Sequence, residues 1–131
     1  MVNSVPTNGD HRSLDRLSIP DARVYYRKVS SWFLPSAFKG PYEMKDISKS
    51  SLRFHEGILS ANNTVIELKI LFPGVSNLRI KGRVAGPQDD KNYHRGYTLI
   101  HFLPFGSRKV YNSYRCKRKL DRIIAEFSQK K

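Results

Sequence analysis

The sequence predicts a mainly β domain in which antiparallel strands close into a small barrel and a helix follows at the carboxyl end. Two segments alternate apolar and charged residues at every second position, the pattern of strands with one buried and one wet face. After residue 107 the apolar residues recur at steps of three and four, which is typical of an amphipathic helix. With 131 residues, of which 39% are hydrophobic, the chain suffices for one domain with a packed core.

Five segments are predicted to be extended. Residues 25–34 are rich in aromatic and β-branched residues, which favour strands. Residues 42–57 are interpreted as a second strand, interrupted or bulged at its serine-rich middle. Residues 62–74 begin with a turn at the sequence NNT and continue as a strand, and residues 77–86 form the next one. Residues 97–105 have the composition of a strand that is buried on both faces. These spacings favour antiparallel hairpins that close into a barrel.

The alternation assigns faces in the two most regular segments. The core-facing residues are expected to be Ile66, Leu68 and Ile70 in the first, and Leu78, Ile80 and Val84 in the second. The residues expected to face water are Glu67 and Lys69 in the first, and Arg79, Lys81 and Arg83 in the second.

The two ends of the chain differ in character. Residues 1–19 are polar and lack periodicity, so we expect a flexible segment with at most a short ordered piece at 13–17. The folded domain is expected to span 20–128, including a helix at 107–128 that packs on the barrel or closes one end of it. The apolar stripe of this helix is Val110, Tyr114, Leu120, Ile123, Ile124 and Phe127. From residue 107 onward nine basic residues stand against Asp121 and Glu126, a surplus of seven positive charges.

The charge of the whole chain points to anionic partners. Lysine and arginine total 24 against 11 acidic residues, a formal net charge of +13. Such a field attracts nucleic acid, nucleotides, acidic lipid headgroups or acidic proteins without choosing among them. No stretch approaches the roughly 20 apolar residues that cross a bilayer. The start of the chain lacks the pattern of a secretory leader, and the single cysteine fits a reducing compartment, so a cytoplasmic location is expected.

The residues that usually carry catalysis or bind metals are missing from their usual spacings. The four histidines and Cys116 show no metal-ligand pattern, and neither G-x-S-x-G nor G-x-x-x-x-G-K occurs. We therefore expect no enzyme, no metal and no cofactor. Cys116 lies among basic residues, which is expected to lower the pKa of its thiol.

The first candidate binding stretch is DARVYYRKV, residues 21–29. In an extended chain Arg23 and Arg27 point to the same face about 13 Å apart. Their planar guanidinium groups suit phosphate oxygens and the O6/N7 edge of guanine. Tyr25 and Tyr26 lie between them, and one of these rings offers a surface on which a base can stack. Alternatively, the two arginines simply occupy the wet face of a strand.

The second stretch, DISKSS, supplies complementary groups. The carboxylate of Asp46 can accept hydrogen bonds from N1 and N2 of guanine, and Ser48 and Ser51 add small hydroxyl groups that let a ligand approach the backbone. Asp and Ser are also favoured in turns, where they bond their own backbone.

Taken together, Arg-x-x-x-Arg, then Asp-x-Ser-x-x-(small) after about twenty residues, then LRF, resembles the PilZ domain family. The segments TVIELKILFPG, LRIKGRVAG and YTLIHFLPF and the terminal helix are similar to the later strands and the helix of that family. The resemblance covers residues 20–127 and implies a six-stranded antiparallel barrel that binds cyclic di-GMP, a bacterial second messenger.

The resemblance also implies roles for individual residues. Arg23 and Arg27 would contact phosphates and guanine edges, and Asp46, Ser48 and Ser51 match the motif that holds a guanine. The amino-terminal segment would become ordered around the ligand and alter a surface for a protein effector, and Arg16 would join the site if this segment folds over. Two positions depart from the family pattern. Ser51 stands where the family has glycine, and Ala22 stands where it often has another arginine.

Two alternatives remain open. A PilZ-like domain without working motifs would serve as a protein-interaction module that binds no nucleotide. A small barrel would instead bind RNA or DNA through the basic carboxyl-terminal helix.

Overall fold

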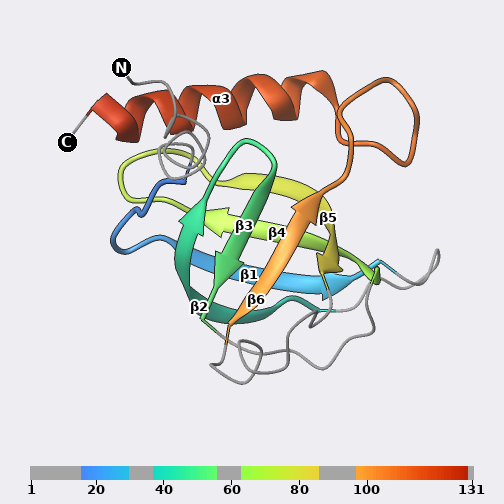
Figure 1. Cartoon of the computed structure of the whole chain (residues 1–131), viewed down its shortest axis with the longest axis horizontal. Helices are drawn as coiled ribbons and strands as arrows, with labels where there is room; N and C mark the ends of the chain where they lie inside the picture. Colours follow the sequence, from blue (N-terminus) through green and yellow to red (C-terminus); the bar gives the residue numbers. More distant parts are fainter. Residues whose placement is uncertain (1–15, 30–36, 56–62, 86–96, 130–131) are drawn as a thin grey trace, which may run out of the picture.

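Six antiparallel strands form a closed barrel in the computed structural model, and a helix follows them (Figure 1). The structure describes residues 16–29, 37–55, 63–85 and 97–129. The elements are β1 Arg23–Lys28, β2 Lys39–Ile47, β3 Ser51–Phe54, β4 Val65–Leu71, β5 Leu78–Ala85, β6 Thr98–Phe102 and α3 Tyr114–Gln129. Around the barrel the order is β1, β2, β3, β6, β5, β4, and β4 pairs with β1 to close it. The predicted mainly β fold, a six-stranded antiparallel barrel with a carboxyl-terminal helix, is confirmed.

The alternation in β4 and β5 separates core from surface as predicted. The apolar members, Ile66, Leu68, Ile70, Leu78, Ile80 and Val84, are all at most 3% exposed. The charged members of both strands point outward and are half-buried or exposed. Gly82 faces inward between these side chains, and a Cβ there would lie 2.8 Å from the carbonyl oxygen of His101. Glycine is therefore needed where β5 closes against β6.

Two strand predictions need refinement. The interruption expected at the serine-rich middle of residues 42–57 is observed, and it is a turn at residues 48–50 that makes β2 and β3 separate antiparallel strands. The reason is that the serine hydroxyls bond to the backbone and reverse the chain there. β6 is not buried on both faces, because Ile100 is fully buried while His101 is exposed.

The helix lies across one end of the barrel (Figure 1). Leu120 and Ile123 are buried in the same core as the strands, and the ring of Phe127 lies 6.0 Å from that of Phe72 beyond β4. The predicted role in closing the barrel end is thus confirmed. Its predicted stripe was too long, however, since Val110 is 64% and Tyr114 is 56% exposed.

The helix also begins later than predicted, at Tyr114 rather than at residue 107. The preceding chain is held by buried Asn112, whose side chain accepts a hydrogen bond from the Lys81 backbone N–H at 2.8 Å. The Asn112 amide donates to the carbonyl oxygens of Lys81 and Leu103. These bonds hold the chain against β5 in a non-helical conformation, whereas the sequence periodicity alone would continue the helix backwards.

The described chain already packs against the barrel before β1. Leu17 and Ile47 exchange two backbone hydrogen bonds, of 2.8 and 3.0 Å, and Leu17 and Ile19 belong to the core. Most of the predicted flexible segment 1–19 lies outside the described residues. Its last four residues extend the barrel wall alongside β2 and bring Arg16 to the surface of the sheet.

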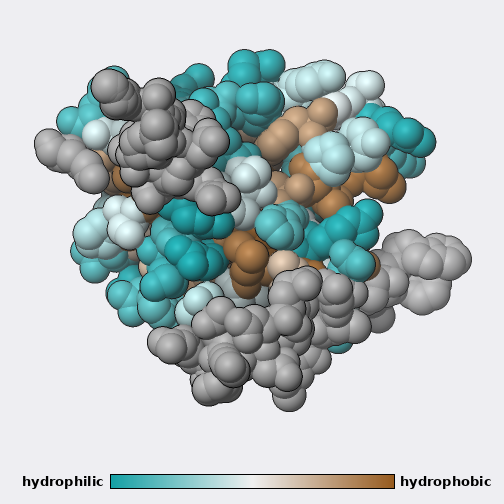
Figure 2. Space-filling view, in the orientation of Figure 1, coloured by the Kyte–Doolittle hydropathy of each residue, from teal (hydrophilic) through white to brown (hydrophobic). Residues whose placement is uncertain are grey.

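The surface is largely hydrophilic. On the face shown in Figure 2, teal residues cover most of the described surface and brown residues are visible mainly beneath the helix. Within the described ranges, no helix is both long enough and apolar enough to cross a membrane.

Candidate functional site

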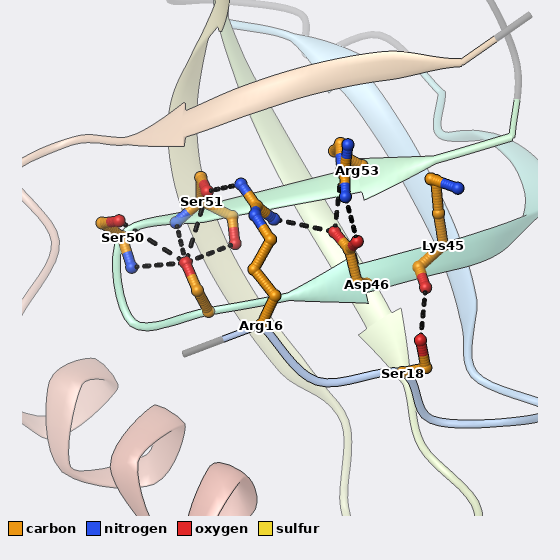
Figure 3. Close-up of polar contacts among 8 residues, drawn as sticks. Arg16, Ser18, Lys45, Asp46, Ser50, Ser51 and Arg53 are labelled. Carbon is orange, nitrogen blue, oxygen red and sulfur yellow. Dashed lines mark hydrogen bonds and ion pairs between the residues drawn. The ribbon is translucent and has the colours of Figure 1, made fainter. Parts of the chain in front are cut away.

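A carboxylate shared by two arginines lies on the outer wall of the barrel (Figure 3). Asp46, at the end of β2, accepts a hydrogen bond from Arg16 Nη1 on Oδ1 at 2.7 Å. Arg53, directly opposite Asp46 on β3, donates from Nε to Oδ1 at 3.0 Å and from Nη2 to Oδ2. The carboxylate side chain is 10% exposed, while the arginine side chains are 28% and 27% exposed. The Arg16–Asp46–Arg53 cluster therefore buries its acid and leaves both cations within reach of solvent.

Local backbone geometry explains why Asp46 faces outward. The β2–β3 register is irregular between Met44 and Asp46, so that Met44 and Ile47, three residues apart, both point into the core. A bulge of this kind changes which residues of a strand face out. On the other side of β2, the Leu17–Ile47 bridge fixes the neighbouring residue Arg16 beside Asp46.

Two serines complete the cluster at the β2–β3 turn. Ser51 Oγ accepts a hydrogen bond from Arg16 Nη2 at 2.6 Å and lies 3.3 Å from Ser48 Oγ. Ser48 Oγ accepts from the backbone N–H groups of Ser50 and Ser51, at 3.2 and 3.1 Å. Both serines are at most 5% exposed. The predicted turn role of these serines is therefore observed, and Asp46, Ser48 and Ser51 lie together as the sequence suggested.

Serine at position 51 carries no backbone strain. Among the described non-glycine residues, a left-handed backbone occurs at Asp21 and Asn63 only. The backbone of Ser51 pairs with His101 in the β3–β6 ladder, a conformation that any residue adopts. In this conformation, position 51 therefore does not require glycine.

An aromatic ring lies beside the cluster. The guanidinium carbon of Arg53 is 5.6 Å and Lys45 Nζ is 5.4 Å from the centre of the Tyr97 ring. The pKa of Arg53 is raised above its ordinary value, chiefly by the hydrogen bonds to Asp46 and against the effect of burial. Arg53 is therefore a permanent cation between a carboxylate and a ring.

The other two predicted residues lie on β1 and outside this cluster. Arg23 and Arg27 both face outward, as expected, while Tyr25 faces out and Tyr26 faces into the barrel. Arg27 pairs with Glu67 of β4, with Nε to Oε1 at 2.9 Å. Tyr26 lies opposite Lys39, seven residues before Asp46 on β2, so Arg27 is about 20 Å or more from the carboxylate at the usual strand rise.

Arg23 occupies an intermediate position. It pairs across the strands with Glu43, three residues before Asp46, and its Nη1 donates to the backbone oxygen of Ala22 at 3.2 Å. The structure thus brings Asp46, Ser48 and Ser51 together with Arg16, leaves Arg23 about 10 Å along the strand, and holds Arg27 at the other end of the barrel.

Sequence reasoning missed Arg53 and gave Arg16 only a conditional role. A signal for Arg16 exists, because Arg12 and Arg16 repeat the four-residue spacing of Arg23 and Arg27 eleven positions earlier. Arg12 lies outside the described residues. For Arg53 the signal is weaker. If a short turn joins two strands, a cation five to seven residues after an acid can lie opposite that acid on the second strand, where opposite charges stabilise the pair.

The groups of the cluster suit a planar anionic ligand. Two guanidinium groups offer forked donors for phosphate or for the O6/N7 edge of guanine, and one carboxylate offers acceptors for N1 and N2. Among the described residues, no group of three or more histidine, cysteine or acidic residues is arranged to hold a metal ion. The chain matches no protein-family model, and no curated protein is significantly similar to it.

Proposed function

We propose that this protein is a receptor for cyclic di-GMP that binds the nucleotide at the Arg16–Asp46–Arg53 cluster. The observation that carries the proposal is the sharing of one buried carboxylate by two solvent-accessible guanidinium groups from separate segments. Together these groups offer the acceptors and donors that a guanine edge and a phosphate need. The ring of Tyr97 beside Arg53 adds a surface for stacking a base.

The contacts of Arg16 also suggest how binding is transmitted. In the structure Asp46 and Ser51 hold Arg16, and with it the chain that leads into β1. A guanine that donates to Asp46 competes with Arg16 for the same acceptor, while the phosphates of the ligand attract the released guanidinium. Binding therefore exchanges an internal contact for a ligand contact and repositions the amino-terminal segment. A protein effector that recognises this segment would sense the change.

The arginine pair of the resemblance is reassigned in this proposal. Arg12 and Arg16, rather than Arg23 and Arg27, supply the Arg-x-x-x-Arg element, because Arg16 already contacts Asp46 and Ser51. Arg23 remains within reach of a second phosphate. Arg27 is committed to Glu67 and takes no part.

Titration calorimetry with cyclic di-GMP tests the proposal. The wild-type chain is expected to bind, and Arg16→Ala is expected to weaken binding about tenfold to a hundredfold, the loss of roughly 1.5–3 kcal/mol for a charge-assisted hydrogen bond. Asp46→Asn removes the charge, keeps the shape and should have an effect of similar size. Lys69→Ala is the control, since Lys69 is an outward-facing strand cation on β4, three strands from β3 around the barrel. Equal affinity of the wild type and Arg16→Ala would contradict the assignment.

A second candidate function is a protein-interaction module with the same fold and no nucleotide. It is favoured by one observation: both oxygens of Asp46 and the hydroxyl of Ser51 already have partners within the protein. Such a cluster is complete as a clamp on the amino-terminal segment. The absence of both heat and a melting-temperature shift at saturating cyclic di-GMP would favour this function over the first.

A further inference from the structure

The outer face of β4 and β5 places like charges directly opposite one another. In the β4–β5 ladder Lys69 faces Arg79. Directly opposed like charges destabilise a sheet, whereas opposite charges stabilise it. In the same ladder Glu67 faces Lys81 and bonds to Arg79 Nη1 at 3.3 Å, but it also pairs with Arg27 of β1. One carboxylate thus serves several cations.

Aromatic rings lie among these cations. The ring of Phe38, just before β2, has the charged groups of Arg27, Lys69 and Arg79 at 4.3, 5.1 and 5.1 Å from its centre. The ring of Tyr25 on β1 lies 5.2 Å from Lys69 Nζ. Cation–π contacts partly relieve the repulsion between the cations, because the ring face is negative. Tyr25 and Phe38 are both half-buried, so part of each ring reaches the surface.

The remaining charge on this face is not neutralised by the described residues. Within the described parts of β1, β4 and β5, Glu67 is the one acidic side chain that points outward. Five cations share this surface with it: Arg27, Lys69, Arg79, Lys81 and Arg83. We name these six residues, with Tyr25 and Phe38, the basic strand face. It adjoins the first half of α3, since Lys81 Nζ lies 3.5 Å from the backbone oxygen of Lys109 and Cys116 Sγ lies 3.3 Å from that of Arg79. A local conflict of this kind, kept in an otherwise regular ladder, is expected at a functional site.

We infer that the basic strand face binds single-stranded nucleic acid. The cations would follow the phosphates of an extended strand, and the Tyr25 ring would stack on a base. This combination of a positive surface with aromatic rings is the general solution for binding single strands without sequence preference. The inference does not depend on the cyclic di-GMP site, which lies on β2 and β3.

The rings decide among the polyanions that the charge alone would attract. A duplex hides its bases from a barrel surface, and a polyphosphate has no bases to stack. An anionic membrane requires exposed apolar side chains that enter the lipid, whereas the outward residues of β4 and β5 are mostly charged. Of these polyanions, only a single strand can both place its phosphates on the cations and stack a base on the Tyr25 ring that lies among them.

Fluorescence anisotropy with labelled RNA and DNA strands of about 12 nucleotides tests the inference. The full chain is expected to bind both, with an affinity that falls steeply between about 50 and 200 mM NaCl. Lys69→Glu is expected to weaken binding at least tenfold at about 50 mM salt and to lessen the slope of log affinity against log salt. Tyr25→Ala should weaken binding roughly fivefold to a hundredfold, the range for one stacked base, while Tyr25→Phe should bind as the wild type does.

Lys49→Glu is the matched control, because it makes the same charge change at an exposed lysine in the β2–β3 turn. Circular dichroism of each variant establishes that it is folded. The inference is supported if Lys69→Glu and Tyr25→Ala weaken binding and Lys49→Glu does so much less. It is overturned if the wild type does not bind at about 50 mM salt, or if Lys49→Glu and Lys69→Glu weaken binding equally. Tighter binding to duplexes of equal length or to anionic phospholipid vesicles would overturn it as well.

Discussion

At the scale of single residues, Asp46 joins three segments of the chain through one carboxylate. Removing an acid from water is costly unless charged and hydrogen-bonding partners replace the lost solvent. Arg16 and Arg53 donate three hydrogen bonds to this carboxylate, which explains how an aspartate that is 7% exposed is tolerated on a strand. The guanidinium groups retain solvent access, so the same residues remain available to an anion.

At Cys116, burial affects the pKa of the thiol more than the neighbouring positive charges do. The sequence places it among basic residues, and the expectation of a lowered thiol pKa was wrong. Burial raises the pKa of Cys116 above the ordinary value of 9.0, and this effect exceeds the lowering by Lys119 and Lys81. The thiol also donates a hydrogen bond to the carbonyl oxygen of Arg79 at 3.3 Å, which favours the protonated form.

The pH dependence of alkylation follows from this shift. Iodoacetamide reacts with the thiolate, and a raised pKa reduces the thiolate fraction at every pH. The alkylation rate of the native protein should therefore reach half of its plateau above pH 9.0, the ordinary value of the group. The same measurement in denaturant, where burial is lost, should return the midpoint to the ordinary value. A native midpoint below that of the denatured chain would contradict the structure.

At the scale of elements, Asn112 fastens the helix to the barrel. Its side chain bonds both backbone groups of Lys81 on β5 and the carbonyl oxygen of Leu103 after β6, at 2.8 to 3.1 Å. The Asn112 amide thereby bonds β5 as the backbone of a neighbouring strand would, and α3 starts two residues later. Leu120 and Ile123 then reach the open end of the barrel.

Asn112→Ala is expected to lower the free energy of unfolding by at least about 1–3 kcal/mol, the cost of one buried polar group left without a partner. The substitution removes one hydrogen bond from each of three backbone groups, of which the Lys81 oxygen keeps its bond from the Leu103 N–H, and alanine offers none in return. Urea denaturation followed by circular dichroism measures the change. Asn77→Ala, at an exposed asparagine before β5, is the control and should stay within about 0.5 kcal/mol of the wild type. Equal stability of the two variants would show that Asn112 is not an anchor.

The elements that could be predicted from the sequence are those with a local signal. The strict alternation of β4 and β5 predicts which of their residues are buried. The apolar stripe Leu120, Ile123 and Phe127 likewise predicts the buried side of the carboxyl-terminal half of α3. The β2–β3 turn has a local signal in its serines, whereas the start of α3 could not be placed, because Asn112 acts through bonds to β5 that periodicity does not contain. The same limit applies to the candidate site. Asp46, Ser48 and Ser51 are close in sequence, but the contact of Arg16 with Asp46 spans 30 residues and depends on the Leu17–Ile47 bridge.

At the scale of the whole molecule, closure of the barrel keeps the centres of the two proposed surfaces apart, and the surfaces come nearest where Ser51 and Arg83 pair with His101 from either side. β3 lies three strands from β4 in either direction around the barrel, so Arg53 and Lys69 are on opposite walls. The helix covers one end between these walls and leaves the sides of the barrel open (Figure 1). The Arg16–Asp46–Arg53 cluster sets one acid against two cations, whereas the basic strand face sets Glu67 against five cations and so carries the larger excess.

This separation predicts that the two binding activities fail independently. Arg16→Ala should weaken cyclic di-GMP binding and leave oligonucleotide affinity within about twofold of the wild type, because Arg16 bonds to β2 and β3 on the wall opposite Lys69, and its charge is screened beyond about 10 Å at ordinary salt. Lys69→Glu should do the reverse. Calorimetry with the dinucleotide and anisotropy with the single strand, both at about 150 mM salt, measure the two affinities on the same four proteins: wild type, both single variants and the double variant. In the double variant the two losses should equal those of the singles, as expected for sites without shared partners. Competition between saturating dinucleotide and the oligonucleotide would instead mean that a single surface, centred near Arg23 on β1, serves both ligands.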